Sequence, residues 1–389
     1  MCIFSRDFAK MSIINIGNIP LLPTEAIIFV WAFYKITDIF VKKNTNGYYF
    51  FDIKYLLYIT FIIMVFTLSK FTLWNVREFV TFSYIIIIFV SYDFFNSLDD
   101  FIIIKSIFYY SLVVIIIMTL VNNIGSFRVM EAGNYTYKGN HNTVFLAFAL
   151  SLISIIEKKQ RLFDYIVFSL SIIWILFFAL HRSTIIAIVI STLVFMSSFE
   201  RKRIMKPLLF SLAFLLLFNF IANMGGFGND IEAIGKRVST IRDYEEDYNA
   251  NWRMEFWQEA INYSTSDLKV FFVGNGLGIT DVEKKFAFRE EYSGNILEGY
   301  SASFHNSYVY LFSRIGILGL MLFLLIIAKP LLISYNNKNI FYLKSFGLAL
   351  LTILIFSAFN VVFENSYLGF FIWFYSGGIF AYINKVNIC

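Results

Sequence analysis

Three side chains that can act on an anion or a hydroxyl stand where polar segments meet long apolar runs. Arg182 lies in LHRST between two apolar runs, Arg253 lies in NWRMEFW, and His305 lies in SFHNSYVY, where the chain turns apolar again. A guanidinium is a planar fork of donors that fits phosphate oxygens. An imidazole can accept a proton from a hydroxyl near neutral pH. These residue types indicate anion binding combined with base catalysis.

Each of these residues also has a simpler structural interpretation. Arg182 can be an interface arginine whose side chain reaches lipid phosphate, or a buried cation that faces a central cavity. Arg253 can be a surface residue of a loop helix, with Glu255 and Glu259 nearby. His305 can be a structural histidine at the membrane interface. The residue types alone leave these alternatives open.

Further polar side chains precede an apolar run earlier in the chain. Arg128 comes first, and the segment Gly139-Asn140-His141-Asn142 opens the run itself. Asparagine side chains can bind sugar hydroxyls or cap a helix N-terminus. Capping is the simpler interpretation for Asn140 or Asn142, and substrate contact is the alternative.

One arginine is expected to lie well inside the membrane. Arg314 follows Asn306 by eight residues, roughly 12 Å along a helix that rises about 1.5 Å per residue. A charged side chain at that depth needs a partner. Glu364 and a phosphate of the ligand are the partners that the sequence offers.

The composition is that of a membrane protein. The chain has 389 residues, of which 58% are hydrophobic and 15% are charged. A soluble domain needs a more highly charged surface, and apolar runs here reach membrane-spanning length. Cys2 and Cys389 stand at opposite ends, so neither a structural disulfide nor a Cys/His metal site is expected. The net charge of +5 fits basic cytoplasmic loops and does not indicate a nucleic-acid partner.

The apolar runs predict an all-α polytopic membrane protein with eleven transmembrane helices, or twelve if a weakly hydrophobic segment within residues 8–22 also crosses. The spans lie at about 24–41, 55–69, 78–92, 104–121, 142–156, 164–180, 183–199, 207–224, 306–328, 344–363 and 365–384. A tight turn at Glu364 separates the last two. Residues 1–389 then form a single integral membrane domain.

Basic residues indicate the orientation of the spans. Three Lys/Arg in 157–161 and four in 200–206 mark cytoplasmic connections. Further cytoplasmic markers are Lys42, Lys43, Lys54, Lys329, Lys338 and Lys344. Alternation then places four segments on the outer face: residues 122–141, the His181-Arg182 hairpin, residues 225–305 and the Glu364 turn. The 225–305 segment is the large loop between the eighth and ninth spans.

Two stretches of the 225–305 loop carry local structural patterns. Residues 249–263 repeat aromatic and apolar side chains at helical spacing and predict a helix. Residues 269–273, KVFFV, predict a short extended segment that leads into a tight turn in GNGLG, residues 274–278. The glycine spacing differs from the nucleotide-binding pattern G-x-G-x-x-G, so no such site is expected.

The combination of these features is more specific than any one of them. Arg182 stands at the tip of a helix hairpin, and the large loop then holds R-x-x-x-W from Arg253, a G-x-G-x-G turn, and H-N-x-Y from His305, which leads into RIGILGL. This combination resembles the O-antigen polymerase and O-antigen ligase superfamily of bacterial envelopes. The similarity covers residues 128–320.

The resemblance implies a glycosyltransferase C-like membrane fold that acts without metal or other cofactor at the periplasmic face of the bacterial inner membrane. Members of the superfamily move a glycan from an undecaprenyl-pyrophosphate carrier to an acceptor hydroxyl. Carried over, His305 would be the catalytic base or the residue that orients the acceptor, and Arg182 and Arg253 would bind the pyrophosphate and stabilise it as the leaving group. The expected substrate-binding residues are Arg128, Asn140, Asn142, Arg237, Trp257, Asn306, Tyr308 and Arg314.

Four functions fit a chain of this kind. The favoured one is an O-antigen polymerase of lipopolysaccharide biosynthesis, which joins lipid-linked repeat units and works with a chain-length-determinant co-polymerase. The AT-rich character of the composition favours it. An O-antigen ligase would instead move the glycan onto lipid A-core. A lipid-linked oligosaccharide flippase or another transporter is expected to show internal repeats, and the sequence has none. A purely structural partner of the chain-length regulator is the fourth.

Overall fold

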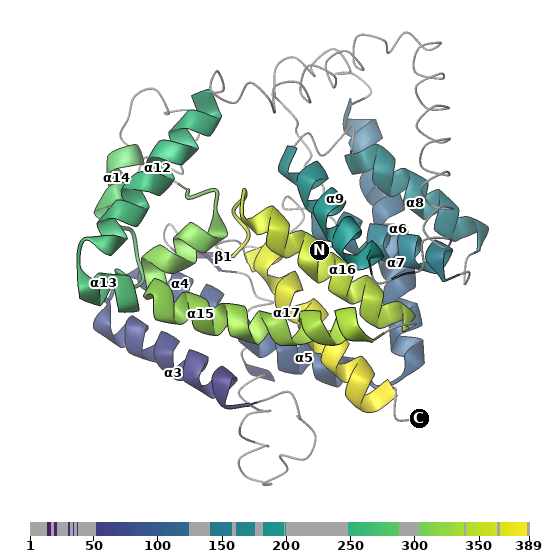
Figure 1. Cartoon of the computed structure of the whole chain (residues 1–389), viewed down its shortest axis with the longest axis horizontal. Helices are drawn as coiled ribbons and strands as arrows, with labels where there is room; N and C mark the ends of the chain where they lie inside the picture. The colour runs from purple at the N-terminus through teal and green to yellow at the C-terminus, as the bar shows by residue number, and fades with distance from the viewer. Residues whose placement is uncertain are drawn as a thin grey trace.

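The computed structural model is an α-helical bundle with a small group of helices at one end (Figure 1). It describes residues 14–16, 19–21, 30, 31, 34, 37, 52–123, 141–157, 161–175, 182–197, 199, 248–287, 303–337, 340–363 and 366–386. The first and eighth predicted spans, 24–41 and 207–224, lie largely or wholly outside these residues.

The helices of the bundle follow the predicted apolar runs. They are α3 (Ile53–Leu68), α4 (Leu73–Phe82), η2 (Ser83–Ile86), α5 (Ile87–Phe94), α6 (Leu98–Asn123), α7 (His141–Ile156), α8 (Leu162–Ile173), α9 (Arg182–Met196), α15 (Ser307–Asn336), α16 (Phe341–Ser357) and α17 (Ser366–Ala381), which continues into the π-helical turn η7 (Tyr382–Val386). Within the described residues, three stretches are long and apolar enough to cross a membrane: Trp74–Phe94, Leu98–Met118 and Ser307–Asn336. The described helices are those of an α-helical, multi-pass membrane protein.

A β-hairpin stands where the sequence left room for a twelfth span. Strands β1 (Ile14–Ile16) and β2 (Ile19–Leu21) pair antiparallel. Their extended backbone excludes a continuous helix through residues 8–22. The intervening Gly17-Asn18 is a residue pair typical of two-residue hairpin connections.

The third predicted span is not one regular helix. A 3₁₀ turn, η2, separates α4 from α5. Hydroxyls bind carbonyls of the preceding turn here, with Ser83 Oγ donating to Phe79 O (2.8 Å) and Thr81 Oγ1 donating to Arg77 O (3.2 Å). Such bonds compete with the regular helix pattern and often accompany a bend. The predicted third span, at about 78–92, lies within the apolar stretch Trp74–Phe94, and the apolar run did not indicate the 3₁₀ turn inside it.

The ninth predicted span is longer than expected and is interrupted. It extends to Asn336 rather than ending near residue 328, and Gly316 has a non-helical backbone (φ 62°, ψ −172°). A Cβ at Gly316 would overlap the backbone of the incoming loop at Phe272. This position therefore needs glycine, both for its positive φ and for the close approach.

The tenth predicted span ends earlier than expected. Helix α16 stops at Ser357, and residues 358–363 form a turn, named the 358–363 turn below. The final carbonyls are satisfied locally, because Phe359 N–H and Asn360 Nδ2 both donate to Phe356 O (3.1 and 3.2 Å). Glu364, where the sequence predicted the turn, lies outside the described residues.

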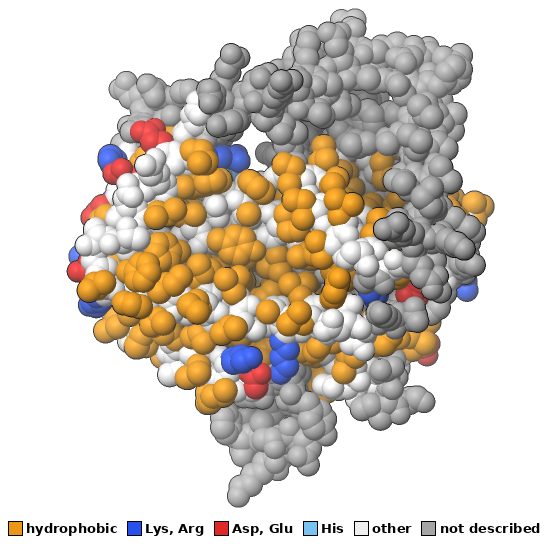
Figure 2. All heavy atoms as spheres, in the orientation of Figure 1, with side chains coloured by type: hydrophobic (Ala, Val, Ile, Leu, Met, Phe, Trp, Pro, Cys, Tyr) orange, Lys and Arg blue, Asp and Glu red, His pale blue; other side chains and the backbone are white. Residues whose placement is uncertain are grey.

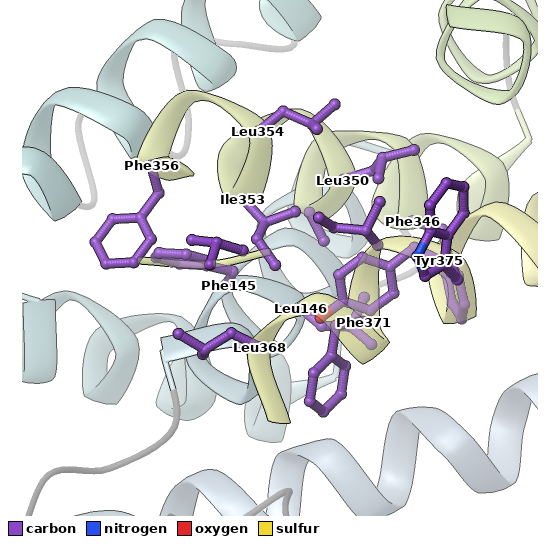
Figure 3. Close-up of a cluster of buried hydrophobic side chains, with 14 of the residues drawn as sticks. Phe145, Leu146, Phe346, Leu350, Ile353, Leu354, Phe356, Leu368, Phe371 and Tyr375 are labelled. Atoms are coloured by element: carbon purple, nitrogen blue, oxygen red, sulfur yellow. The ribbon is translucent and has the colours of Figure 1, made fainter. Parts of the chain in front are cut away.

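The centre of the bundle is α7. Every residue from 142 to 156 is buried, as expected of a helix that is apolar on all sides. Figure 3 shows Phe145 and Leu146 of α7 in one cluster with Phe346 of α16 and Phe371 of α17. Packing against this core fixes the position of α16, whose end carries the candidate site described below.

Apolar side chains also cover the outside of the bundle (Figure 2). They lie on α3, α6, α9 and α15, and examples are Leu57, Ile103, Leu193 and Leu325, which are 48 to 63% exposed. An apolar exterior of this extent is unfavourable in water and suits the hydrocarbon of a bilayer.

Polar contacts between elements gather at the two ends of the bundle. At the start of α3, Asp52 pairs with Lys329 (3.0 Å), whereas at its other end Ser69 Oγ accepts from Leu277 N–H (2.8 Å). Two more ion pairs join segments assigned to the same side as Asp52: Lys105–Asp164 (2.7 Å) and Lys385–Asp93 (4.0 Å). The predicted orientation of the spans in a membrane stays a prediction.

Lys344 was expected in the connection before the tenth span. It lies instead inside α16, fully buried, with Nζ donating to Tyr335 O (3.3 Å) and facing the Phe199 ring at 4.8 Å. The reason is that α15 runs on to Asn336 and α16 already begins at Phe341, which leaves a short connection.

Two of the loop helices test the predictions for residues 225–305. Helix α12 (Tyr248–Thr265) confirms the predicted helix, and its inner face buries Trp252, Phe256 and Ala260. The predicted extended segment at 269–273 is wrong, because these residues belong to helix α13 (Leu268–Val273). Asp267 caps that helix by accepting from the N–H groups of its first turn, at 2.6 and 3.2 Å. A third helix, α14 (Asp281–Ala287), follows the glycine turn.

Candidate functional site

The 358–363 turn is where the predicted catalytic segments meet. Arg253, on α12, donates from Nη1 to the carbonyl of Phe359 (3.4 Å). This contact brings the loop helix against the outer end of α16. A guanidinium carries its N–H donors in a planar fork, the geometry that fits the oxygens of a phosphate.

The segment that follows His305 binds the same turn. Ser307 Oγ donates to Asn360 O (3.0 Å) and accepts from the N–H groups of Val362 (2.9 Å) and Phe363 (3.2 Å). Three bonds to one hydroxyl fix the start of α15 on the turn. His305, two residues earlier, is therefore held near the end of α16 that contacts Arg253.

The segment of Arg182 reaches the turn from the opposite side. Asn360 Nδ2 donates to Ser183 Oγ (2.7 Å), and Arg182 is the residue before Ser183 and the first residue of α9. The side chain of Arg182 lies outside the described part of the structure. Its backbone position nevertheless places all three predicted catalytic residues on segments that converge on residues 358–363.

His305 stands between two fixed points of the chain. Before it, Phe304 is buried against Phe256 (ring centroids 4.9 Å), and its carbonyl accepts from Trp257 Nε1 (2.5 Å). After it, Asn306 caps α15 with its side chain, which accepts from two backbone N–H groups of the first turn at 3.0 and 3.2 Å. His305 itself has a positive φ of 49°, which is uncommon for a residue other than glycine and is a conformation that surroundings must enforce.

The imidazole of His305 lies beside α12. Its ring meets Trp252 edge to face, with centroids 6.3 Å apart and planes at 74°. Trp252 precedes Arg253 on the helix, so the candidate base and the candidate anion-binding arginine share one local structure. The arrangement suits a reaction in which a hydroxyl loses a proton close to a bound anion.

Three predicted substrate-binding residues have framework contacts in the structure. Trp257 holds Phe304, Asn306 caps α15, and Tyr308 OH donates to Leu354 O (2.9 Å). All three lie around His305. Their contact with a substrate stays a prediction.

Arg314 is buried and has two carboxylate partners. Its Nε lies 3.0 Å from Glu78 Oε1, and its Nη2 lies 2.7 Å from Glu283 Oε1. The need for a partner is thus confirmed, and neither glutamate was indicated by the sequence. Glu364, the carboxylate that was expected, lies outside the described residues. The predicted role of Arg314 in substrate binding stays a prediction.

The glycine turn closes the gap that Gly316 makes in α15. The N–H groups of Asn275 and Gly276 donate to the carbonyls of Ser313 (2.8 Å) and Arg314 (3.1 Å), which lose their helical partners at the interruption. Gly274 has φ 88°, and a Cβ there would overlap the Arg314 carbonyl. The predicted tight turn is confirmed, and its function is to complete a broken helix.

The earlier polar segment lies only partly within the structure. Asn142 is the second residue of α7 and fully buried, with its Nδ2 donating to Leu368 O (3.3 Å) and its carbonyl accepting from Tyr375 OH (2.9 Å). Because α7 begins at His141, Asn142 lies inside the helix and is not its N-cap. Asn140, Arg128 and Arg237 lie outside the described residues, so their predicted roles stay predictions.

Several residues that build this site were missed from the sequence. They are Ser183, Ser307 and Asn360 around the turn, and Glu78 and Glu283 around Arg314. A usable signal existed for the first group, since each is a polar residue at the end of an apolar run. Within the described residues, no three His, Cys, Asp or Glu side chains gather as a metal site would require.

Comparison with known proteins addresses the same region. No curated protein matches the chain. A family model described as O-Antigen ligase matches residues 166–324, a stretch that begins in α8, includes Arg182, Arg253, the glycine turn and His305, and ends in α15. The match confirms the resemblance to the O-antigen polymerase and O-antigen ligase superfamily over residues 166–324, a region in which the chain is similar to the O-Antigen ligase family.

Proposed function

We propose that this protein is an O-antigen polymerase, a membrane glycosyltransferase that joins oligosaccharide repeat units carried on undecaprenyl pyrophosphate. His305 takes the proton of the acceptor hydroxyl, and the acceptor oxygen bonds to the anomeric carbon of the donor. The bond from that carbon to the pyrophosphate oxygen breaks, and its electron pair leaves with undecaprenyl pyrophosphate. A single displacement of this kind inverts the configuration at the anomeric carbon.

The arginines act on the leaving group. Negative charge grows on the pyrophosphate as the bond breaks, and fixed guanidinium groups stabilise that charge more strongly than they stabilise the ground state. Arg253 and Arg182 take this role. Around them, Arg128, Arg237, Asn140 and Asn142 are proposed to contact the glycan or the phosphates.

One observation carries the proposal. The segments of Arg182, Arg253 and His305 are far apart in the chain, yet each is tied to the 358–363 turn by a hydrogen bond made by the residue itself or by a residue within two positions of it. A purely structural role does not require these three residues to lie near one short segment. A site that binds an anion next to a catalytic base does require it.

The proposal includes the position in the cell. The protein crosses the bacterial inner membrane eleven times in a glycosyltransferase C-like fold, and residues 225–305 lie over the site on the periplasmic side. The chain-length-determinant co-polymerase is the expected protein partner. The apolar exterior of the bundle supports a position within a membrane.

An O-antigen ligase is the second candidate, because the matched family model carries that description. The two activities share the donor and the leaving group and differ in the acceptor. A polymerase uses the sugar of another lipid-linked repeat unit, whereas a ligase uses lipid A-core. The acceptor therefore decides between them.

The test uses purified full-length protein with lipid-linked repeat units extracted from a host strain that lacks this gene. A polymerase makes a ladder of longer lipid-linked glycans from these units alone. A protein that makes no ladder but transfers glycan once lipid A-core is added is a ligase. Arg161→Lys serves as a matched arginine control, since Arg161 is exposed at the start of α8, away from the 358–363 turn.

A further inference from the structure

Arg314 belongs to a buried ionic network that joins three elements. Its guanidinium, 1% exposed, contacts Glu78 of α4 and Glu283 of α14. The other carboxylate oxygens are also satisfied: Glu78 Oε2 accepts from Gly278 N–H (2.5 Å), and Glu283 Oε2 accepts from both the N–H and the hydroxyl of Thr280 (2.7 Å each). Each of the four carboxylate oxygens thus has a donor.

A network of this kind needs a reason beyond stability. Removing three charges from water is unfavourable, and well-packed apolar residues often serve as well or better in the same place. Fixed geometry is what an ionic network adds, because a guanidinium that binds two carboxylates has one orientation. Here it locks α15, α4 and α14 together around the glycine turn.

The guanidinium also supports the aromatic residue that precedes His305. Arg314 Cζ lies 5.7 Å from the centre of the Phe304 ring and 5.1 Å from that of Tyr310, and the two rings meet edge to face at 5.8 Å. Cation–π contacts of a desolvated arginine are among the stronger ones. Phe304 is thus held by Arg314 and Tyr310 on α15 and by Phe256 on α12.

These contacts connect the network to His305. The backbone of His305 is in the left-handed region, so its neighbours must keep it there. Phe304 is the neighbour on one side, and its ring packs against the guanidinium of Arg314.

We propose that Arg314, oriented by Glu78 and Glu283, is a positioning residue that sets the imidazole of His305 through Phe304. This inference rests on the proposed function, because it assigns His305 the task of taking the acceptor proton. In it, Arg314 acts on the reaction without touching the substrate.

The first test is Arg314→Lys, which keeps the charge and loses both the fork and the flat face. Folded protein, measured by size-exclusion of the purified sample, stays close to wild type. Turnover per folded molecule falls about 10- to 100-fold, the size expected of a slightly displaced catalytic group. The KM for the lipid-linked donor stays within about twofold, because the pyrophosphate-binding arginines are unchanged.

A second readout follows His305 directly and does not depend on activity. Diethyl pyrocarbonate modifies imidazoles, and mass spectrometry of the digested protein reports the rate at each histidine. In Arg314→Lys the modification rate at His305 changes at least about threefold, which corresponds to the free energy of roughly one hydrogen bond. The modification rate at His141 does not change. His141 is the internal control. It is the first residue of α7, and its ring stacks on that of Phe356 in α16, apart from the Arg314 network.

Lys329→Gln is the matched structural control. It breaks the Lys329–Asp52 ion pair at the far end of α15. If the effect of Arg314→Lys came only from a weaker bundle, Lys329→Gln would reproduce it. We expect wild-type turnover per folded molecule and wild-type reactivity of His305 in this control.

A folded Arg314→Lys protein with wild-type turnover and wild-type His305 reactivity would overturn the inference. If Arg314→Lys does not fold, Phe304→Leu decides instead, because it removes the supported ring and leaves the ionic network intact. Wild-type values in Phe304→Leu overturn the inference equally. Failure of the proposed function looks different: His305→Ala would then keep full activity, while the chemical reactivity of His305 still reports whether Arg314 positions it.

Discussion

Asn360 donates a hydrogen bond from Nδ2 to Oγ of Ser183, although 177 residues separate the two in the chain. The bond ties the beginning of α9, where Arg182 stands, to the end of α16. Arg253 donates to the carbonyl of Phe359, and Ser307 donates to the carbonyl of Asn360 itself. Residues 359 and 360 therefore contact three distant segments of the chain.

Replacing Asn360 by alanine tests this arrangement, because it removes the side-chain bonds to Ser183 and Phe356 and keeps the backbone contacts of the turn. The free energy of unfolding should fall by about 1 kcal/mol for each hydrogen bond lost, and turnover should fall as well, because the segment of Arg182 is no longer tied to the turn. Asn337→Ala is the matched control, since Asn337 Nδ2 also donates to a carbonyl at the end of a helix, that of Ile333 (2.7 Å), but at the other end of the bundle. Equal turnover in the two variants, measured per folded molecule, would remove Asn360 from the site.

Arg253→Lys tests the anion-binding role. Lysine keeps the charge and loses the planar fork, so charge stabilisation in the transition state weakens, and kcat/KM for the lipid-linked donor should fall about 100-fold. Release of undecaprenyl pyrophosphate in a single turnover is the measurement. Arg161→Lys should leave this rate unchanged. A wild-type rate in Arg253→Lys would show that the arginine only fastens α12 to the turn.

Gly316→Ala tests the interruption of α15. The positive φ at Gly316 and the backbone of Phe272 leave no room for a methyl group, so the variant should lose about 2 kcal/mol or more of stability, as strained backbone positions do. Thermal unfolding in detergent is the measurement. Gly369→Ala is the control, because a Cβ there meets only ordinary contacts from 3.4 Å outward, and we expect it to unfold at the wild-type temperature.

Chelation tests the absence of a metal from the proposed mechanism. With arginines stabilising the leaving group, addition of EDTA should leave the rate of ladder formation within about twofold of the untreated rate. Recovery of a lost rate by added Mg²⁺ or Mn²⁺ would contradict this part of the mechanism.

Local patterns in the sequence were sufficient for much of the fold. The helix around Trp252 and Phe256 follows from the spacing of its apolar residues, and within the described residues three stretches follow from their length and hydropathy as candidate spans. The short run 269–273 could not be assigned in this way, because a few consecutive apolar residues fit a strand and a buried helix equally well. In the structure, the N-terminal cap that Asp267 provides stabilises these residues as helix α13.

Only part of the candidate site could be predicted from the sequence. Arg182, Arg253 and His305 stand out because they are charged or titratable residues beside apolar runs. Their common anchor at residues 358–363, and the pairing of Arg314 with Glu78 and Glu283, join positions up to 236 residues apart. No local pattern encodes such pairings, since they depend on how whole helices pack.

The most direct test of the account is His305→Ala in the purified full-length protein, supplied with lipid-linked repeat units. Loss of the proton acceptor should lower the rate of ladder formation by about 100-fold or more, with binding of the lipid-linked donor and the amount of folded protein unchanged. A ladder that forms at the wild-type rate in His305→Ala would contradict the account.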